Sequence, residues 1–174
     1  MIKSLATFTL GIASLAASSA ALAKNVDPAH MELGKAIVAT GVTFRINPPQ
    51  CFDQSQTMGW YWSEQNELAV CQQARTQVNT ETYWTAEDFD TLRHEAHHLV
   101  QDCMDGYFNN DLGSVYKEPI GLGKEVLGVP GMQAIAKAYE AQGPHIVVLE
   151  IEAFSVARMN QPLEQVADIK TYCL

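Results

Sequence analysis

The sequence predicts one α+β domain whose C-terminal half is dominated by helices. Alternating apolar and polar residues between Val42 and Gln73 are typical of short strands. Apolar residues at helical spacing follow Asp27, follow Thr85 and recur from Pro130 to the C-terminus. No internal repeat or linker separates these segments, so we expect them to share one core.

The N-terminal segment, residues 1–23, predicts a secretory signal peptide. Lys3 precedes an apolar run, and the small residues Ala21 and Ala23 mark a cleavage site. We therefore expect residues 24–174 to be exported as one domain, either to the periplasm or to the extracellular medium. No later segment offers about 18 uninterrupted apolar residues, so no membrane insertion is expected after cleavage. An uncleaved N-terminal anchor is the alternative.

The balance of charges limits the kinds of partner that this protein could bind. Lysine and arginine number 11 against 20 aspartates and glutamates, which gives a formal net charge of −9. An acidic surface repels both nucleic acid and anionic membranes. The charge therefore argues against nucleic acid as a partner and leaves a peptide or protein substrate open.

The chain has four cysteines, and an even number in an exported protein predicts two disulfides. Four cysteines allow three pairings. We prefer Cys51 with Cys71 and Cys103 with Cys173, because the first pair would pin the sheet region and the second would fasten the C-terminus to the central helix. The close spacing typical of a cysteine-rich zinc site is absent.

The N-terminal half should form a helix followed by a short, mostly antiparallel sheet. Asp27 and Pro28 are typical of a helix start, and the pattern AHMELGKAIVAT runs to Gly41. Val42 to Ile46 alternates as a strand does. The runs MGWYWS and LAVCQQ are separated by the polar residues EQNE, which predicts a hairpin.

The C-terminal half should be helical apart from one long loop. Thr85 and Asp88 predict a capping box, and the helix that they open should end at Gly106. Residues 107–128 are rich in Gly and Asn and predict a loop, which in a compact domain is often functional. Three proline-opened helices are then expected at residues 130–142, 144–160 and 162–172.

The predicted central helix carries the segment His94-Glu95-Ala96-His97-His98. Side chains one turn apart lie on the same helix face, so His94 and His98 can offer imidazole nitrogens to one Zn²⁺ ion. Glu95 is turned by about 100° from His94 and can take a proton from water beside the metal. We expect His97 to lie beside the site or at the surface.

The remainder of this helix supports that orientation. Apolar side chains fall within about 60° of the direction opposite to His94. This face should therefore pack on the core and leave the histidines to face elsewhere. It is formed by Phe89, Leu92, Ala96, Leu99, Val100 and Cys103.

A catalytic zinc ion needs a third protein ligand. Gln101 and Met104 stand where the extended metzincin pattern has glycine and a third histidine, so that class is not expected. The segment PHIVVLEIEAFSVARMN offers Glu150 and Glu152 instead. Glu150 lies among apolar residues on a helical wheel, where a carboxylate requires a partner, whereas Glu152 lies on a side more open to solvent. We prefer Glu150 and keep Glu152 as the alternative.

HEAHH followed by LEIEAFSVA resembles the gluzincin class of zinc metallopeptidases, and in particular its small, minimal members. The resemblance implies a zincin-like domain that covers nearly all of residues 24–174. It also implies one catalytic zinc ion held by His94, His98 and a glutamate of the EIEA stretch, with Glu95 as general base. Many relatives have Asp or Asn four residues after the ligand glutamate, where this chain has Phe154 or Val156.

Further residues could support such a site. The run LAVCQQ resembles the edge strand on which an extended peptide substrate lies, although it could equally be an ordinary hairpin strand. Asp102 stands one turn after His98 and could accept its second ring N–H, or it could simply be solvated. Four residues are candidates to stabilise an oxyanion: His145, Tyr83, Tyr107 and Tyr116.

The sequence therefore predicts an exported zinc metallopeptidase that cleaves a peptide or protein substrate. The alternative is an exported zinc-binding or pseudo-enzyme domain that recognises a partner without cutting it. Glu95 distinguishes the two, because a structural zinc site needs no base beside the metal and is expected to have four protein ligands.

Overall fold

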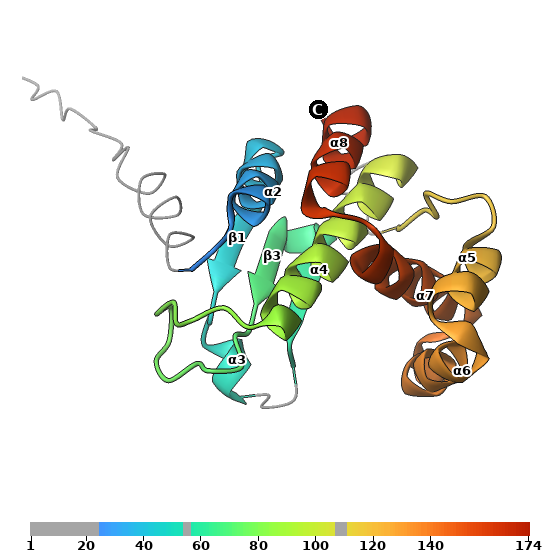
Figure 1. Cartoon of the computed structure of the whole chain (residues 1–174), viewed down its shortest axis with the longest axis horizontal. Helices are drawn as coiled ribbons and strands as arrows, with labels where there is room; N and C mark the ends of the chain where they lie inside the picture. The colour runs from blue at the N-terminus through green and yellow to red at the C-terminus, as the bar shows by residue number, and fades with distance from the viewer. Residues whose placement is uncertain (1–24, 54–56, 107–110) are drawn as a thin grey trace, which may run out of the picture.

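A computed structural model describes residues 25–53, 57–106 and 111–174, and confirms the α+β class (Figure 1). Seven α-helices and a three-stranded sheet lie within these residues. The predicted signal peptide and Tyr107 lie outside the described residues. No helix in the described part of the chain is both long and apolar enough to cross a membrane.

The first described helix, α2 (Pro28–Ala39), begins and ends where the sequence predicts. The Asp27 carboxylate accepts hydrogen bonds from two backbone N–H groups of the first turn, at 2.9 and 3.1 Å. Pro28 occupies the first turn, where no N–H donor is needed. Gly41, with φ of 91°, follows the helix. Leu33 and Ile37 are fully buried and hold α2 to the core.

The sheet contains strands β1 (Thr43–Ile46), β2 (Gly59–Trp62) and β3 (Glu67–Val70) in the order β1-β3-β2. The predicted hairpin is confirmed, because β2 and β3 pair antiparallel. The expectation of a mostly antiparallel sheet is wrong, since β1 and β3 pair in parallel. The hairpin inserts its second strand between β1 and β2, so the LAVCQQ run begins in the middle of the sheet and cannot be its edge.

Two short helical segments accompany the strands. α3 (Gln50–Asp53) follows the Pro48-Pro49 pair and was not predicted, and the 3-10 turn η1 (Ser63–Gln65) joins β2 to β3. Asn66 ends this turn in the left-handed region, with φ of 51°. Asparagine tolerates that conformation better than most residues, which explains why the polar EQNE segment can reverse the chain.

The central helix, α4 (Ala86–Asp105), has the predicted capping box. Asp88 N–H donates to the Thr85 hydroxyl at 3.2 Å, and Thr85 N–H donates to the Asp88 carboxylate at 2.8 Å. The same carboxylate accepts the backbone N–H of Gln73, just after β3, at 2.9 Å. Gly106, with φ of 117°, ends the helix as predicted. The cap therefore also ties the start of α4 to the sheet.

Four helices follow α4 in the described part of the chain. They are α5 (Pro119–Val126), α6 (Gly128–Tyr139), α7 (Pro144–Met159) and α8 (Pro162–Tyr172), with the 3-10 turn η2 (Glu140–Gln142) between α6 and α7. α7 and α8 begin at the predicted prolines. The loop predicted for residues 107–128 is wrong in part, because it contains α5. Gly123 packs directly against Ile151 of α7, so tertiary contact stabilises a helix that its glycines disfavour.

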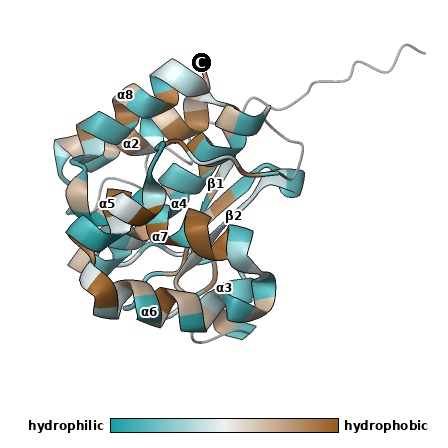
Figure 2. Ribbon diagram, turned by 90° about the vertical axis from the view of Figure 1, so that its right-hand side faces the viewer, coloured by the Kyte–Doolittle hydropathy of each residue, from teal (hydrophilic) through white to brown (hydrophobic). Residues whose placement is uncertain are grey.

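The core lies between the sheet and helices α2, α4 and α8. Each contributes fully buried apolar side chains, among them Leu33, Ile37, Leu68, Leu92, Leu99 and Ile169. Figure 2 shows hydrophilic residues on the outward turns of α2 and α8. α4 crosses the sheet diagonally and also packs against α7 and α8 (Figure 1). It is therefore the element on which both halves of the fold meet.

Both preferred disulfides are confirmed. Cys51 bonds to Cys71, and Cys103 bonds to Cys173, so no described cysteine is free. The second bond fastens the end of α8 to the last turns of α4. Disulfides persist in oxidising compartments, which makes the pairing compatible with an exported protein.

Replacing Cys103 and Cys173 together by serine should lower the free energy of unfolding by about 2–4 kcal/mol. The bond joins residues 70 positions apart, and so removes much of the freedom of the unfolded chain. Urea unfolding followed by circular dichroism would measure the change. An unchanged midpoint would show that apolar contacts alone hold α8 in place.

Candidate metal centre

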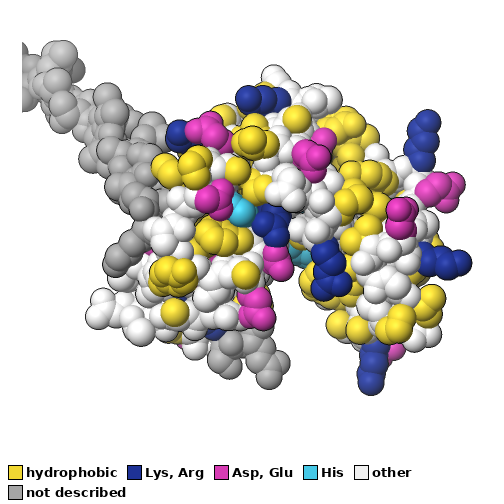
Figure 3. Space-filling model, in the orientation of Figure 1, with side chains coloured by type: hydrophobic (Ala, Val, Ile, Leu, Met, Phe, Trp, Pro, Cys, Tyr) yellow, Lys and Arg dark blue, Asp and Glu magenta, His cyan; other side chains and the backbone are white. Residues whose placement is uncertain are grey.

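A cleft separates the sheet from helices α6 and α7, and Figure 3 shows the hollow between these two parts of the surface. It consists of two cavities of about 660 and 470 Å³. Gly59, His94, Glu95 and Tyr139 line both of them. The cavities therefore meet where the sequence predicts the metal site.

The structure places the imidazoles of His94 and His98 together, as their spacing predicts. Their Nε2 atoms lie 3.0 Å apart, and each residue is only 7% exposed. His94, Glu95 and His98 can each offer a ligand atom within 4.8 Å of the others. The face of α4 that carries them is therefore buried beneath the cleft and is not a solvated surface.

Glu150 of α7 faces both imidazoles. Its Oε2 lies 3.2 Å from His94 Nε2, and its Oε1 lies 3.4 Å from His98 Nε2. Burial raises the pKa of the Glu150 carboxyl, but the hydrogen bonds and charges of the two histidines outweigh burial and hold the pKa below its usual range. Burial lowers the pKa of His98, but Glu150 and then Glu95 raise it above its usual value. The negative charge that attracts a proton here would equally attract a metal cation.

The three side chains have a separation that suits zinc. In tetrahedral coordination at about 2.0–2.1 Å, neighbouring ligand atoms lie about 3.3 Å apart. The observed separations of 3.0, 3.2 and 3.4 Å are close to this value. Two imidazole nitrogens and one carboxylate are also a ligand set that zinc favours. His94, His98 and Glu150 could therefore hold one metal ion with a coordination position to spare.

Glu95 lies beside this triad and also contacts β2. Burial raises the pKa of its carboxyl, the charges of His94 and His98 lower it, and Glu150 raises it again. A backbone hydrogen bond from Tyr61 of β2 also lowers the pKa. The balance leaves the pKa above its usual value, so Glu95 holds a proton more readily than an ordinary glutamate does.

The alternative third ligand, Glu152, faces away from the triad. The expectation that it lies toward solvent is wrong, because it is fully buried. His97 is also fully buried, which excludes the surface alternative for this residue and leaves the alternative of a position beside the site. The Glu152 carboxylate accepts hydrogen bonds from His97 Nε2 at 2.8 Å, Gln101 Nε2 and Val115 N at 3.0 Å, Tyr116 N at 3.2 Å, and the Ser114 hydroxyl. Because these donors occupy it, we assign Glu152 to the packing of α7 on α4.

Asp102 was expected to accept the second ring N–H of His98, but Gln101 contacts that nitrogen instead. The Nδ1 atom of His98 lies 2.7 Å from Gln101 Oε1. Asp102 instead accepts a hydrogen bond from the Tyr61 hydroxyl at 2.6 Å. Tyr61 turns the short Asp102 side chain toward the sheet, whereas the longer Gln101 side chain reaches back to the imidazole.

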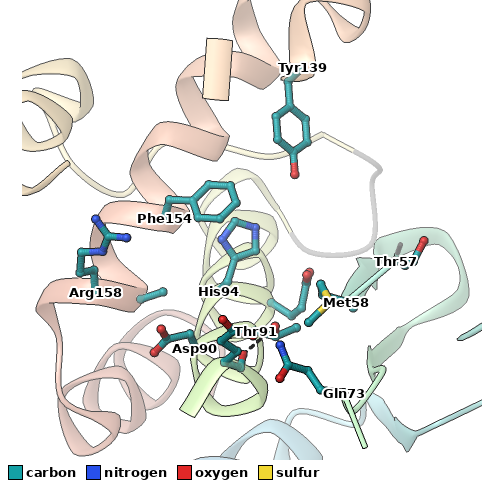
Figure 4. A pocket seen from close by; sticks show the side chains of 13 residues that line it. Thr57, Met58, Gln73, Asp90, Thr91, His94, Tyr139, Phe154 and Arg158 are labelled. Carbon is teal, nitrogen blue, oxygen red and sulfur yellow. Dashed lines mark hydrogen bonds between the residues drawn. The ribbon is translucent and has the colours of Figure 1, made fainter. Parts of the chain in front are cut away.

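His94 has a different environment from that of His98. Its ring packs against the Phe154 ring (Figure 4). The two ring centroids lie 4.2 Å apart. Its Nδ1 atom is buried and has no hydrogen-bond partner among the described residues. Phe154 follows Glu150 by one helical turn on α7. Packing against Phe154 therefore takes the place of a hydrogen bond to that ring.

Tyr139 is the cleft residue that the sequence interpretation missed. It comes from the end of α6, and its hydroxyl points into the cavity above His94 (Figure 4). Burial raises the pKa of Tyr139, and the nearby carboxylates of Glu150 and Glu95 raise it further. No local motif marks this tyrosine, because only the folding of α6 against α7 brings it to the cleft.

The predicted oxyanion candidates lie elsewhere or at the margin. Tyr83 is 65% exposed and does not line either cavity. The Tyr116 ring lies against His97, outside the cleft. His145 lines the smaller cavity, and its Nε2 atom lies 3.1 Å from the carbonyl oxygen of Leu112. Of these described candidates, only His145 reaches the cleft.

Comparison with known proteins identifies the family. The family described as "Domain of unknown function (DUF8637)" matches residues 21–174, and the chain belongs to it. No curated protein and no solved structure matches the chain. Its function must therefore be argued from the residues and geometry of the cleft.

Gly59 should tolerate no side chain, because β2 approaches α4 closely at this position. A Cβ atom there would lie 2.6 Å from Thr91 Cγ2, 2.7 Å from the carbonyl oxygen of Ala69 and 3.2 Å from Glu95 Cγ. Gly59→Ala should therefore destabilise the protein by about 1–3 kcal/mol in urea unfolding. Gly121→Ala is the control, since its Cβ would meet only Glu118 Cβ at 3.6 Å and should be neutral or slightly stabilising. Equal stabilities of the two variants would contradict this account.

Proposed function

We propose that this DUF8637 protein is a zinc-dependent peptidase in which His94, His98 and Glu150 hold the metal ion. The observation that carries the proposal is the convergence of these three ligands, from two helices, beside the buried carboxylate of Glu95. The resemblance to small gluzincins and the α+β fold with its central helix support it. So does a cleft whose two cavities meet at the site.

The residues around the proposed metal site then have defined roles in the reaction. When bound, zinc would lower the pKa of water and polarise a peptide carbonyl group. Glu95 takes a proton from the attacking water and returns it to the leaving amine. Its raised pKa suits both steps, because a general base works best when its pKa lies near the working pH. The backbone N–H of Tyr61 keeps its carboxylate beside β2.

Tyr139 would stabilise the negative charge that develops on the carbonyl oxygen. Its raised pKa keeps the phenol protonated, so it remains a hydrogen-bond donor at neutral pH. The hydroxyl points into the same cavity as His94 (Figure 4). A fixed donor aimed at a developing oxyanion is among the largest contributions to catalysis.

We assign the substrate-pairing strand to β2 instead of β3. The carbonyl oxygen of Met58 accepts the N–H of Cys71, at 2.7 Å, on the β3 side. In an antiparallel pair the next residue turns its backbone groups the other way, so those of Gly59 point toward the edge of β2 that β3 does not occupy. A peptide pairing with this edge would lie directly over Glu95. The substrate is therefore an extended peptide or an unfolded stretch of protein.

The purified protein, lacking its predicted signal peptide, should bind one zinc ion. His98→Ala and Glu150→Ala should lose it, since each removes a ligand. Glu95→Gln should keep the zinc ion and lose about 100- to 10,000-fold in the hydrolysis of an unfolded protein substrate. Atomic absorption and a fluorogenic casein assay would measure the two quantities on the same preparations.

Two results would overturn the proposal. If the wild-type protein and the ligand variants are equally free of zinc, the triad is only a buried histidine–carboxylate cluster. If zinc binds and neither the wild type nor Glu95→Gln cleaves any peptide, the domain recognises a partner without cutting it.

Tyr139→Phe should retain zinc and lose about 100- to 1,000-fold in kcat, because it removes one oxyanion donor. Tyr83→Phe is the matched control, since that residue is exposed and lies away from the cavities. It should leave both zinc content and kcat unchanged. Equal rates for the two variants would remove Tyr139 from the mechanism.

A further inference from the structure

Gln101 is a fully buried amide, and both of its polar atoms have partners. Its Nε2 atom donates to the Leu149 carbonyl oxygen at 3.2 Å and to Glu152 Oε1 at 3.0 Å. Its Oε1 atom lies 2.7 Å from His98 Nδ1. The side chain therefore bridges α7 and a proposed metal ligand of α4.

The partners determine which way the amide points. A backbone carbonyl oxygen can only accept a hydrogen bond, so the atom facing Leu149 must be the NH₂ group. The atom that faces His98 is consequently the amide oxygen, which has no proton to donate. This conclusion depends on the Leu149 carbonyl alone and is the same whatever the charge of Glu152.

The orientation of Gln101 in turn determines the tautomer of His98. Because the amide oxygen only accepts, Nδ1 of His98 must carry a proton. The lone pair of the neutral ring then lies on Nε2, which is the atom that faces His94 and Glu150. A hydrogen bond to one ring nitrogen is the usual means by which proteins orient a histidine that ligates a metal through the other.

Glu152 holds Gln101 in this orientation. Its carboxylate is fully buried and is itself held by His97 Nε2 at 2.8 Å and by the backbone N–H groups of Val115 and Tyr116 at 3.0 and 3.2 Å. Gln101 therefore cannot rotate without breaking its hydrogen bonds to Leu149 and Glu152 of α7. The bridge is rigid.

The ring orientation of His98 depends on the hydrogen bond to Gln101, whereas the ring of His94 has no comparable hydrogen bond among the described residues. Among the described residues, Nδ1 of His94 has no hydrogen-bond partner, and its ring is packed by Phe154. One proposed ligand is thus oriented by packing and the other by a hydrogen bond. Loss of the hydrogen bond to Gln101 would leave the His98 ring without a fixed tautomer.

We infer that Gln101, anchored by Glu152, is a positioning residue that holds His98 as its Nδ1–H tautomer and so sets the affinity of the site for zinc. The tautomer follows from the contacts of Gln101 alone, whereas the effect on zinc rests on the proposed function. Gln101 touches neither the substrate nor the reacting atoms, so it acts only through His98.

Gln101→Met tests the inference, because methionine keeps the length of the side chain and removes its amide. Zinc affinity, measured by competition with a chromophoric chelator, should fall about 10- to 100-fold. Gln165→Met is the matched control. Gln165 is 1% exposed, and its amide donates to the Arg93 carbonyl oxygen at 2.8 Å, so the variant loses a buried hydrogen bond without touching the triad. Its zinc affinity should equal that of the wild type.

Nitrogen-15 NMR of the histidine side chains measures the protonation of His98 Nδ1 directly. This quantity would not change if Gln101 only stabilised the fold. In the wild type, Nδ1 of His98 should have the chemical shift of a protonated nitrogen throughout a pH titration, with or without zinc. In zinc-free Gln101→Met, the neutral ring should become a mixture of tautomers. Gln165→Met should give the wild-type spectrum.

The outcomes separate this inference from the proposed function. A wild type that binds no zinc contradicts the proposed function, and the tautomer of its His98 still tests the role of Gln101. An unprotonated Nδ1 in the wild type overturns the inference even if Gln101→Met does not fold. Equal zinc affinities for Gln101→Met and Gln165→Met also overturn it, whether both match the wild type or both are weakened.

Discussion

The burial of two glutamates in the contact between α4 and α7 is the constraint on which the rest of the structure depends. A carboxylate removed from water is costly unless donors or a cation replace the lost hydration. Glu150 and Glu152 are two residues apart on α7 and so point in different directions. Glu150 faces His94 and His98, whereas Glu152 faces His97, Gln101 and the 114–116 segment. The polar side chains of α4 are therefore matched to α7 at two separate places.

These contacts between α4 and α7 require the positions of both helices to be fixed. α4 is fixed at its start by the Thr85 cap and the link from Asp88 to Gln73, and near its end by the Cys103–Cys173 bond. Its apolar face packs on the sheet and on α8. On α7, the small and buried Ala153 and Ala157 allow close approach to α4. The proposed metal ligands thus lie on two rigid elements, which preserves their geometry better than loops would.

The proposed catalytic groups come from parts of the fold that are distant in sequence. Glu95 lies on α4 but hydrogen bonds to β2, and Tyr139 comes from α6. The absence of a side chain at Gly59 lets β2 approach α4 at this point. The sheet, the central helix and the α6–α7 pair therefore each contribute to one cleft.

The sequence by itself determined the starts of α2, α4, α7 and α8, the hairpin and the pairing of His94 with His98, because these depend on caps, turns and periodicity within a few residues. The preferred disulfides are also confirmed, although that pairing needed an assumption about which elements pack together. The choice of Glu150 as the third zinc ligand stays a prediction. Only the tertiary structure decided that β3 lies in the middle of the sheet, that residues 119–126 form α5, and that Glu152 is buried. It also decided that Gln101 and not Asp102 contacts His98, and that Tyr139 lies in the cleft. The physical reason is the same in each case: these outcomes depend on which partner from a distant segment occupies a strand edge, a helix face or a polar atom. Local sequence patterns contain no record of that partner.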